Sequence, residues 1–415
     1  MNWLELKSSP IGTEQQLRAK LARVQWTALA VGLIAMAVCV LFALMGESQR
    51  ESFDRSYLVA YFLWLGVALG SGGAVMIHNL TSGKWGLAVR RVMGAANGNM
   101  PLMALLALPL AWAAGNHHLY GWAGSPFVPD PHLGAHKARL LAPRWVLFRG
   151  MIYLAIWIAT SVMIRVGSRR VEQTRSYAQV RLFAGLSAFG LILYALTLTG
   201  AVVDWVMSLT PDWYSTVFTL TFLMGQMLSG FCFAAVAGGW MIRYEPVHGK
   251  ISADQFNDVG SFMFAFMVLW AYMAFSQLLI SWMGNLKSEM AYYVHRNSGG
   301  WLIVGILLIL LQFAAPFLLL LFKPIKRKPS ALLWVAVGIL VMRWIDLMYM
   351  IKPAFPTRQF SWTDPVLAIG IGGLFVSAFV RTLKRGRLAP PPLVDEYTAV
   401  EAKEIYGRVA GEAAS

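Results

Sequence analysis

Ten long apolar stretches, separated by short polar connections, constrain this chain more than any other feature of its sequence. Each can cross the hydrocarbon core of a bilayer, which is about 30 Å thick and needs roughly 20 helical residues. Only 13% of the 415 residues are charged and 58% are hydrophobic, whereas a soluble domain has about 25% charged residues. We therefore predict an all-α integral membrane protein with about ten transmembrane helices. The ten stretches are residues 24–45, 57–78, 98–114, 145–166, 180–207, 214–242, 260–283, 301–322, 331–349 and 365–383.

The third stretch, 98–114, is the least regular because it contains Pro101 and Pro109. Proline is tolerated in spanning helices where neighbouring groups satisfy the carbonyls that it leaves without a donor. A re-entrant segment that turns back within the bilayer is the alternative for this stretch.

Basic residues alternate between the connections in a way that predicts the topology. With ten crossings, the lysine-rich and arginine-rich segments all fall on one side, and the connection 208–213 on the other side has no Lys or Arg. Cytoplasmic loops are the ones enriched in Lys and Arg, so both termini are expected in the cytoplasm. The basic residues concerned are Lys7, Arg18, Lys20, Arg23, Lys84, Arg90, Arg91, Arg165, Arg169, Arg170, Arg175, Arg181, Lys323, Lys326, Arg327, Lys328, Arg381, Lys384, Arg385 and Arg387.

These patterns divide the chain into three parts. Residues 1–23 form a cytoplasmic N-terminal segment without the features of a cleaved signal peptide, residues 24–383 form the membrane domain, and residues 384–415 form a cytoplasmic tail. The net charge of +15 is explained by the basic residues that set the membrane topology, so we expect no nucleic-acid partner. The expected partner of the apolar surface is the lipid bilayer.

Cysteine and histidine usage argues against a redox cofactor held by this chain alone. Cys39 and Cys232 are far apart in the sequence and no CxxC motif is present, which excludes the usual patterns for zinc, covalently bound haem and iron–sulfur clusters. His78 is the one histidine inside an apolar stretch, so paired axial ligands for b-type haem are missing. His132 and His136 have helical spacing but no third ligand, and we predict no metal site. No phosphate-binding glycine loop is present either.

Ionisable residues in spanning segments are costly and are therefore candidates for function. His78 ends the second stretch, Asp204 is near the end of the fifth, and Arg343 and Asp346 are three residues apart in the ninth. We predict that these four residues contribute to a proton path, and we identify no catalytic residue. The alternative is structural: Arg343 and Asp346 neutralise each other, Asp204 anchors a helix end, and His78 is a hydrogen-bonded residue at a helix terminus.

Several segments resemble the NrfD/polysulfide-reductase superfamily of membrane subunits, and in particular one of its branches. Residues 77–81 (IHNLT) resemble the end of its second span, and 343–346 (RWID) resemble an Arg-x-x-Asp pair in its ninth. The more specific similarities are 205–216 (WVMSLTPDWYST), close to a conserved turn, and 264–272 (FAFMVLWAY) followed by GNL at 284–286. The loop at 119–122 (LYGW), with Asp130, Lys137 and Arg149 after it, is also similar. Thr210 and Asp212 depart from the pattern, which favours Asp and His there.

The branch is alternative complex III, a quinol:electron-acceptor oxidoreductase, and the segments are similar to its ActF-type subunit. The resemblance implies two four-helix bundles, about 57–207 and 214–349, with the first and tenth helices peripheral. It implies a bacterial inner membrane protein whose partners are a homologous ten-helix membrane subunit, an iron–sulfur protein and a multihaem cytochrome c. The haem c and iron–sulfur clusters are expected in those partners. The resemblance implies that this chain scaffolds the complex and contributes a proton path. It allows a contact between this chain and quinone without requiring one.

Two other functions remain as alternatives. The chain could be a quinol-oxidising NrfD-like subunit paired with an iron–sulfur protein. It could also be a secondary transporter, for which interrupted helices are expected at corresponding positions of two halves. Pro101 and Pro109 have no clear counterpart in the second half, where Pro316 is the nearest proline, so the sequence favours the oxidoreductase subunit.

Overall fold

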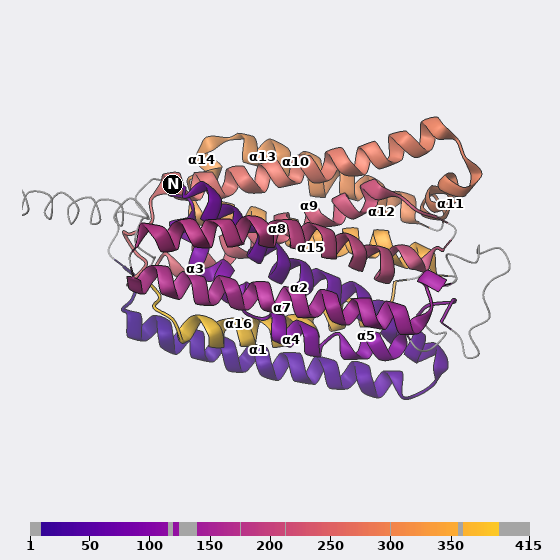
Figure 1. Ribbon diagram of the computed structural model, residues 1–415, viewed down its shortest axis with the longest axis horizontal. Coiled ribbons are helices and arrows are strands. Elements are labelled where there is room, and N and C mark those ends of the chain that lie inside the picture. Colours follow the sequence, from indigo (N-terminus) through magenta and orange to yellow (C-terminus); the bar gives the residue numbers. More distant parts are fainter. Residues whose placement is uncertain are drawn as a thin grey trace, which may run out of the picture.

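The protein is built of helices packed side by side along one axis, as seen in the computed structural model (Figure 1). The structure describes residues 10–114, 119–123, 139–174, 176–211, 213–298, 300–355 and 360–389, and this part contains no β-strand. Within it, nine helices are long and apolar enough to cross a membrane. The chain is therefore an all-α, multi-pass membrane protein. The longer elements are α1 Glu14–Ala43, α2 Glu47–Thr81, α7 Pro143–Thr174, α8 Tyr177–Trp205, α9 Thr216–Met241, α10 Ala253–Gly284, α15 Pro329–Ile351 and α16 Thr363–Lys384.

The remaining elements are short and lie within or between these long helices. They are α3 Gly86–Asn97, α4 Met100–Leu105, α5 Leu108–Ala113, η2 Met207–Leu209, α11 Lys287–Arg296, α12 Trp301–Leu307, η3 Leu308–Ala314, α13 Ala315–Leu321, α14 Lys323–Lys326 and η4 Lys352–Ala354.

The start of α1 and the end of α16 lie at the same end of the molecule, on the left in Figure 1. Arg18 Nη1 donates a hydrogen bond to the carbonyl of Lys384 at 3.1 Å, which ties the two together. We call this the basic end, because segments 84–91, 165–170 and 323–328 also lie there (Figure 1), and we call the other end the far end. The basic segments thus gather at one end, as the sequence predicts.

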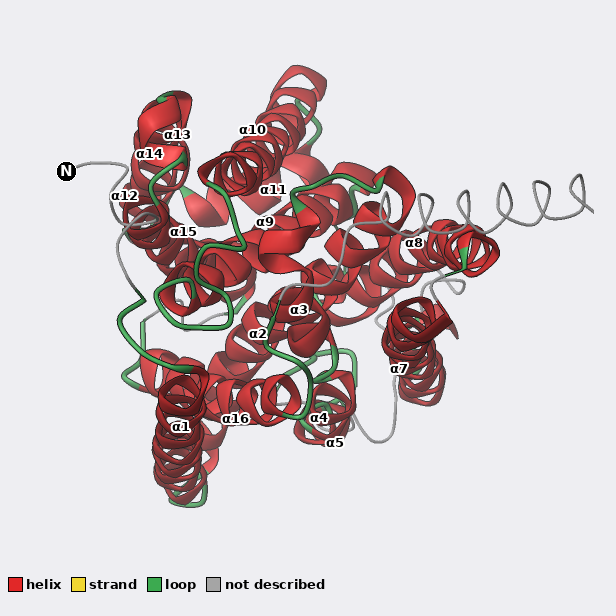
Figure 2. Cartoon of the chain, turned by 90° about the vertical axis from the view of Figure 1, so that its left-hand side faces the viewer, coloured by secondary structure: helices red, strands yellow, loops and turns green. Residues whose placement is uncertain are grey.

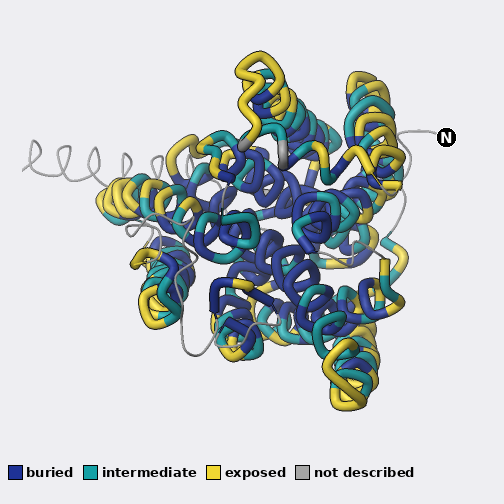
Figure 3. Tube along the Cα trace, turned by 90° about the vertical axis from the view of Figure 1, so that its right-hand side faces the viewer, coloured by how far each residue is buried: buried dark blue, intermediate teal, exposed yellow. Residues whose placement is uncertain are grey.

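Two helices form the centre of the molecule. Viewed along the helix axes, α2 and α9 lie inside a ring of other helices (Figure 2), and the buried residues concentrate there (Figure 3). Glycine permits their close approach: a Cβ on Gly70 would lie 1.8 Å from the carbonyl oxygen of Gln226, and one on Gly230 would lie 2.5 Å from Gly70. Small residues are expected at such helix crossings in membranes, and Gly70 and Gly230 provide them here.

α1 and α16 pair closely with each other on one side of the bundle. The contact again uses glycines, since a Cβ on Gly373 would lie 2.7 Å from the Cα of Gly32. Most residues in the apolar part of α1 face outward, and in a bilayer an apolar surface of this kind is covered by lipid.

The third predicted stretch is a broken helix. α3, α4 and α5 follow one another from the basic end to the far end (Figure 1), with Pro101 and Pro109 near the starts of α4 and α5. The breaks arise because proline lacks an N–H and clashes with the preceding turn. Near the first break, Asn97 Nδ2 donates to the carbonyl of Ala68 at 3.2 Å, and Asn99 Nδ2 donates to that of Phe375 at 2.9 Å. Neighbouring helices thus contribute to the hydrogen bonding around the break, as membrane helices require.

A second irregular helix lies beyond α10. It begins as α12, widens into the π-helical η3 and returns to α-helix in α13, where Pro316 is in the first turn. A wider π turn accommodates the missing N–H and the proline ring, and such turns are frequent at functional sites. This widened segment forms one wall of the site described next.

Candidate functional site

Arg343 and Asp346 form a buried ion pair on one face of α15. The side chains are each 2% exposed, and Arg343 Nη1 donates to Asp346 Oδ2. Trp270 of α10 donates its indole N–H to the same carboxylate oxygen at 3.1 Å. The spacing of three residues brings such a pair together on a helix, and the indole joins the pair to a second helix. The predicted proximity of Arg343 and Asp346 is confirmed.

A glycine in α9 makes room for the arginine. A Cβ on Gly225 would lie 2.3 Å from the guanidinium carbon of Arg343, so any larger residue would displace this group. The guanidinium therefore occupies the interface between α9 and α15 on the inner side of Asp346. Buried charges are tolerated only when they are paired, and this glycine allows the pairing to occur deep between the helices.

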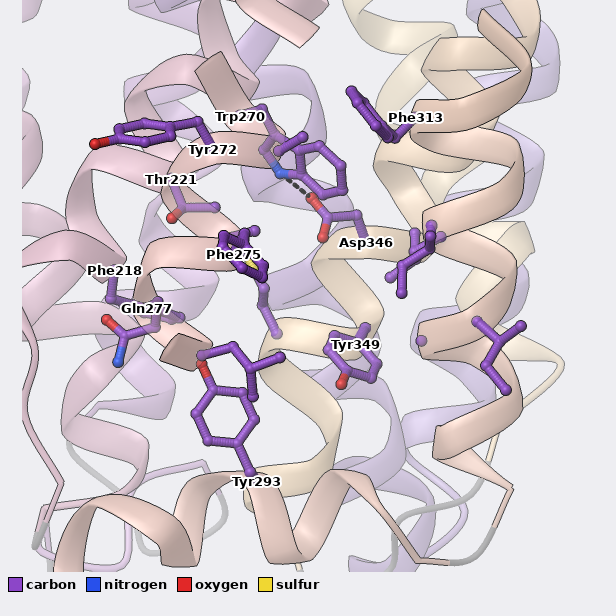
Figure 4. Close-up of a pocket in the computed structure, with 18 of the residues that line it drawn as sticks. Phe218, Thr221, Trp270, Tyr272, Phe275, Gln277, Tyr293, Phe313, Asp346 and Tyr349 are labelled. Carbon is purple, nitrogen blue, oxygen red and sulfur yellow. Dashed lines mark hydrogen bonds between the residues drawn. The ribbon is translucent and has the colours of Figure 1, made fainter. Parts of the chain in front are cut away.

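A cavity of about 650 Å³ lies on the other side of Asp346. Figure 4 shows Trp270, Asp346 and Tyr349 facing it, with Phe313 beside it. The walls come from α9, α10, α11, the α12–η3 segment and α15. The lining residues are Phe218, Thr221, Val268, Trp270, Ala271, Tyr272, Ala274, Phe275, Gln277, Leu278, Tyr292, Tyr293, Asn297, Leu302, Gly305, Ile306, Leu308, Ile309, Phe313, Asp346, Tyr349 and Met350.

The cavity is open to the side of the molecule. Tyr272 and Phe275 on α10, and Ile306 and Ile309 on α12–η3, line it and are between 47% and 63% exposed. Apolar residues with such exposure in the middle of spanning helices face the bilayer. The opening between α10 and α12–η3 therefore connects Asp346 with the lipid.

The short helix α11 closes the cavity at the far end. Its Tyr292 and Tyr293 line the cavity, and Arg296 beneath them donates to the carbonyls of Tyr292, Tyr349 and Met350 at 2.6–3.0 Å. Burial raises the pKa of Tyr292 to about 12 and that of Tyr293 further above its usual value. Both phenols are therefore neutral at physiological pH and add no charge to this end of the cavity.

Asp204 is located at the far end of α8, in a different part of the molecule. Arg149 of α7 forms two bonds with its carboxylate, from Nη2 to Oδ1 and from Nε to Oδ2, both at 2.8 Å, and Tyr153 adds a third at 3.0 Å. Bidentate pairs of this kind are strong and directional. The contact joins α7 to α8, which fits the structural alternative; the predicted proton role of Asp204 stays a prediction.

His78 lies at the opposite end of the molecule, where α2 connects to α3. Arg90 Nη1 is 2.9 Å from His78 Nδ1, and His78 Nε2 is 2.9 Å from the carbonyl of Gly83. A guanidinium can only donate, so Nδ1 accepts and Nε2 donates, which describes a neutral imidazole. Gly86 leaves space for the ring, since a Cβ there would lie 1.9 Å from Nε2. These contacts hold the α2–α3 connection together.

One buried ion pair is absent from our sequence predictions. Lys352 Nζ lies 2.5 Å from Asp364 Oδ1, with side chains 5% and 1% exposed, and Ser56 donates to the same oxygen at 2.6 Å. The pair joins η4, α16 and α2 at the far end. Sequence reasoning missed it because both residues fall just outside the predicted stretches 331–349 and 365–383. The signal available was a Lys and an Asp flanking the same short connection.

Within the described residues, no group of three or more His, Cys, Asp or Glu side chains is arranged to hold a metal ion. His132, His136 and Asp212 lie outside the described residues. In comparisons with known proteins, no family model and no curated protein matches the chain.

Proposed function

We propose that this protein is a membrane subunit of a quinol:electron-acceptor oxidoreductase of the alternative complex III type, and that it has no redox cofactor of its own. In this proposal the interrupted α3–α5 segment counts as a tenth crossing. Residues 57–207 and 214–349 are the two four-helix bundles, and α1 and α16 are peripheral. The segments that resemble the ActF-type subunit support the proposal.

The orientation follows from the charges. We place the basic end in the cytoplasm of a bacterial inner membrane, because the positive-inside rule applies to short loops such as those at 84–91 and 323–328. The proposed partners are a homologous ten-helix subunit, an iron–sulfur protein and a multihaem cytochrome c, which contain the electron carriers.

The role of this subunit is to scaffold the complex and to conduct protons. The observation that supports conduction is the placement of Asp346, a carboxylate in a spanning helix that faces a cavity on one side and Arg343 on the other. A buried carboxylate beside a cation is costly to maintain for packing alone. We assign the exchange of protons to Asp346. The positive charge of Arg343 stabilises the ionised form of this carboxylate.

The test compares two variants of the purified complex in proteoliposomes. Asp346→Asn should lower proton release per electron at least twofold, with the subunits still assembled. Glu172→Gln, which removes a carboxylate in a partly exposed ion pair with Arg91, should leave proton release unchanged. If Asp346→Asn prevents assembly while any complex that forms releases protons normally, the pair is structural and the conduction proposal is wrong.

A further inference from the structure

Four exposed arginines gather where α7 ends and α8 begins, at the basic end of the molecule. Arg165, Arg169 and Arg170 lie on the last three turns of α7, and Arg181 lies on the first two turns of α8. Within the part of the chain that the structure describes, none of the four side chains has a hydrogen bond or an ion pair. We call these four residues the arginine patch.

The packing of α7 against α8 places the arginine patch at one depth in the membrane. A Cβ on Gly167 would lie 2.3 Å from the ring of Phe183, and Val171 packs with Phe183 in the same small cluster. Residues 165–171 of α7 therefore lie beside residues 180–183 of α8. Figure 2, which shows the basic end, places the two helices next to each other at the edge of the bundle.

The carboxylate and the hydroxyl on the inner face of α7 are already bound by α3. Glu172 is the one acidic residue between positions 161 and 185, and it pairs with Arg91 at 3.0 Å. Ser168 accepts a hydrogen bond from Arg90 at 3.4 Å. The arginine patch, on the outer side, therefore has a positive charge that no neighbouring carboxylate of this segment neutralises.

The depth of the arginine patch matches the head groups of a bilayer. Arg165 and Arg181 fall at the ends of the apolar stretches 145–166 and 180–207. From Arg165 to Arg170 the helix rises about 7 Å, and head groups add about 5–7 Å to each leaflet. Towards the middle of the membrane, the neighbouring outward side chains are apolar and between 42% and 56% exposed, namely Val162, Val166, Leu182 and Leu186.

This combination of charge and depth fits one kind of lipid. The planar guanidinium group binds phosphate oxygens in a bidentate manner, and basic clusters at the ends of spanning helices attract anionic head groups. A zwitterionic lipid has its own cation close to the phosphate, and arginines repel that cation. An anionic phospholipid presents the phosphate alone, and its acyl chains can cover the apolar side chains next to the patch.

We infer that the arginine patch binds the head group of an anionic phospholipid, whose acyl chains lie along the outer faces of α7 and α8. The site goes beyond the proposed function, because it takes no part in electron or proton transfer and does not depend on which subunits accompany this chain.

The test is photolabelling of the tagged, full-length chain, together with whatever subunits accompany it, in nanodiscs of phosphatidylcholine. The two probes are phosphatidylglycerol and phosphatidylcholine with the same diazirine-bearing acyl chain, and mass spectrometry maps the labelled peptides. Ordinary contact with the bilayer labels α7 and α8 equally with both probes, so the ratio of the two labels isolates the effect of the head group. We expect phosphatidylglycerol to label these helices about fivefold or more above phosphatidylcholine.

Three double variants locate the site. Arg165→Gln with Arg181→Gln should bring the labelling ratio on α7 and α8 close to one. Arg165→Lys with Arg181→Lys keeps the charges that set the topology and should lower the ratio about twofold, because lysine cannot form the bidentate contact. Arg381→Gln with Arg385→Gln removes the same charge from exposed arginines at the end of α16 and should leave the ratio on α7 and α8 unchanged.

Three results would overturn the inference. The first is equal labelling of the unmodified protein by the two probes. The second is a ratio that the glutamine and lysine variants both leave intact. The third is a lack of any label on α7 and α8 while other helices are labelled, which would show that another subunit covers the arginine patch.

Discussion

At the scale of single residues, three buried carboxylates, Asp204, Asp346 and Asp364, each have a cation in contact. Two of these pairs link different segments, Asp204 with Arg149 of α7 and Asp364 with Lys352 of η4. Arg343 and Asp346 both lie on α15, and Trp270 of α10 joins that pair to a second helix. Transfer of one unpaired charge into such surroundings costs far more than a surface ion pair contributes. The stability of the helical assembly should therefore depend on these pairs.

The pair of Lys352 and Asp364 gives the first prediction. Asp364→Asn removes the carboxylate charge that faces Lys352 and should lower the free energy of unfolding by about 3–5 kcal/mol. Glu14→Gln is the control, because Glu14 and Arg18 are 44% and 42% exposed and such pairs contribute about 0–1 kcal/mol. Unfolding of the detergent-purified variants by heat and denaturant measures both. Equal losses in the two variants would contradict the structural role of the buried pair.

Gly225 gives the second prediction. Gly225→Ala should displace the guanidinium of Arg343 and destabilise the protein by about 1–3 kcal/mol, the usual cost of overpacking. Gly338→Ala, on α15, meets nothing within 4 Å and should be neutral or stabilising by up to about 1 kcal/mol, because alanine favours helices. Thermal unfolding measures the stability of both variants. If Gly225→Ala is as stable as the unmodified protein, the Arg343 guanidinium can adopt another position at no cost, which contradicts the prediction.

At the scale of helices, the sequence predicts most of the fold because a bilayer allows few solutions. The apolar stretches and the alternation of basic segments could both be predicted, whereas the glycine contact of α2 with α9 is visible only in the structure. The exact course of the broken elements could not. Residues 86–97 are polar enough that the sequence predicts a loop, but α3 forms there. The π-helical segment η3 depends on the packing around Pro316, which the sequence does not show. The short amphipathic α11 was missed for the same reason, since its role depends on the cavity that it closes.

The course of α3–α5 gives the third prediction. If this segment crosses the bilayer, cysteines at its two ends should be accessible from opposite sides. Lys84→Cys, at the basic end, should react with an impermeant maleimide only in permeabilised cells, and Gly121→Cys, at the far end, should react in intact spheroplasts. The native Cys39 and Cys232 are fully buried, so the unmodified chain is the background control. Labelling of both cysteines from one side would show a re-entrant segment.

At the scale of the whole molecule, the sequence identifies the ionisable residues of the candidate site but not the cavity. Arg343 and Asp346 are recognisable because they are charged residues three apart in an apolar helix. The cavity is built from α9, α10, α11, α12–η3 and α15 together. Its opening depends on the separation between α10 and α12–η3. The sequence contains 17 tryptophans, and nothing in it distinguishes Trp270 from the others. Only the packing of α10 against α15 shows that Trp270 donates a hydrogen bond to Asp346.

The most direct test of the central proposal is purification of the tagged chain in a mild detergent, with mass spectrometry and an optical spectrum of the product. We predict that a multihaem cytochrome c, an iron–sulfur protein and a second ten-helix subunit accompany it, with haem c absorption in the visible range. A solitary and colourless protein would contradict the assignment to a quinol oxidoreductase complex and would favour a secondary transporter.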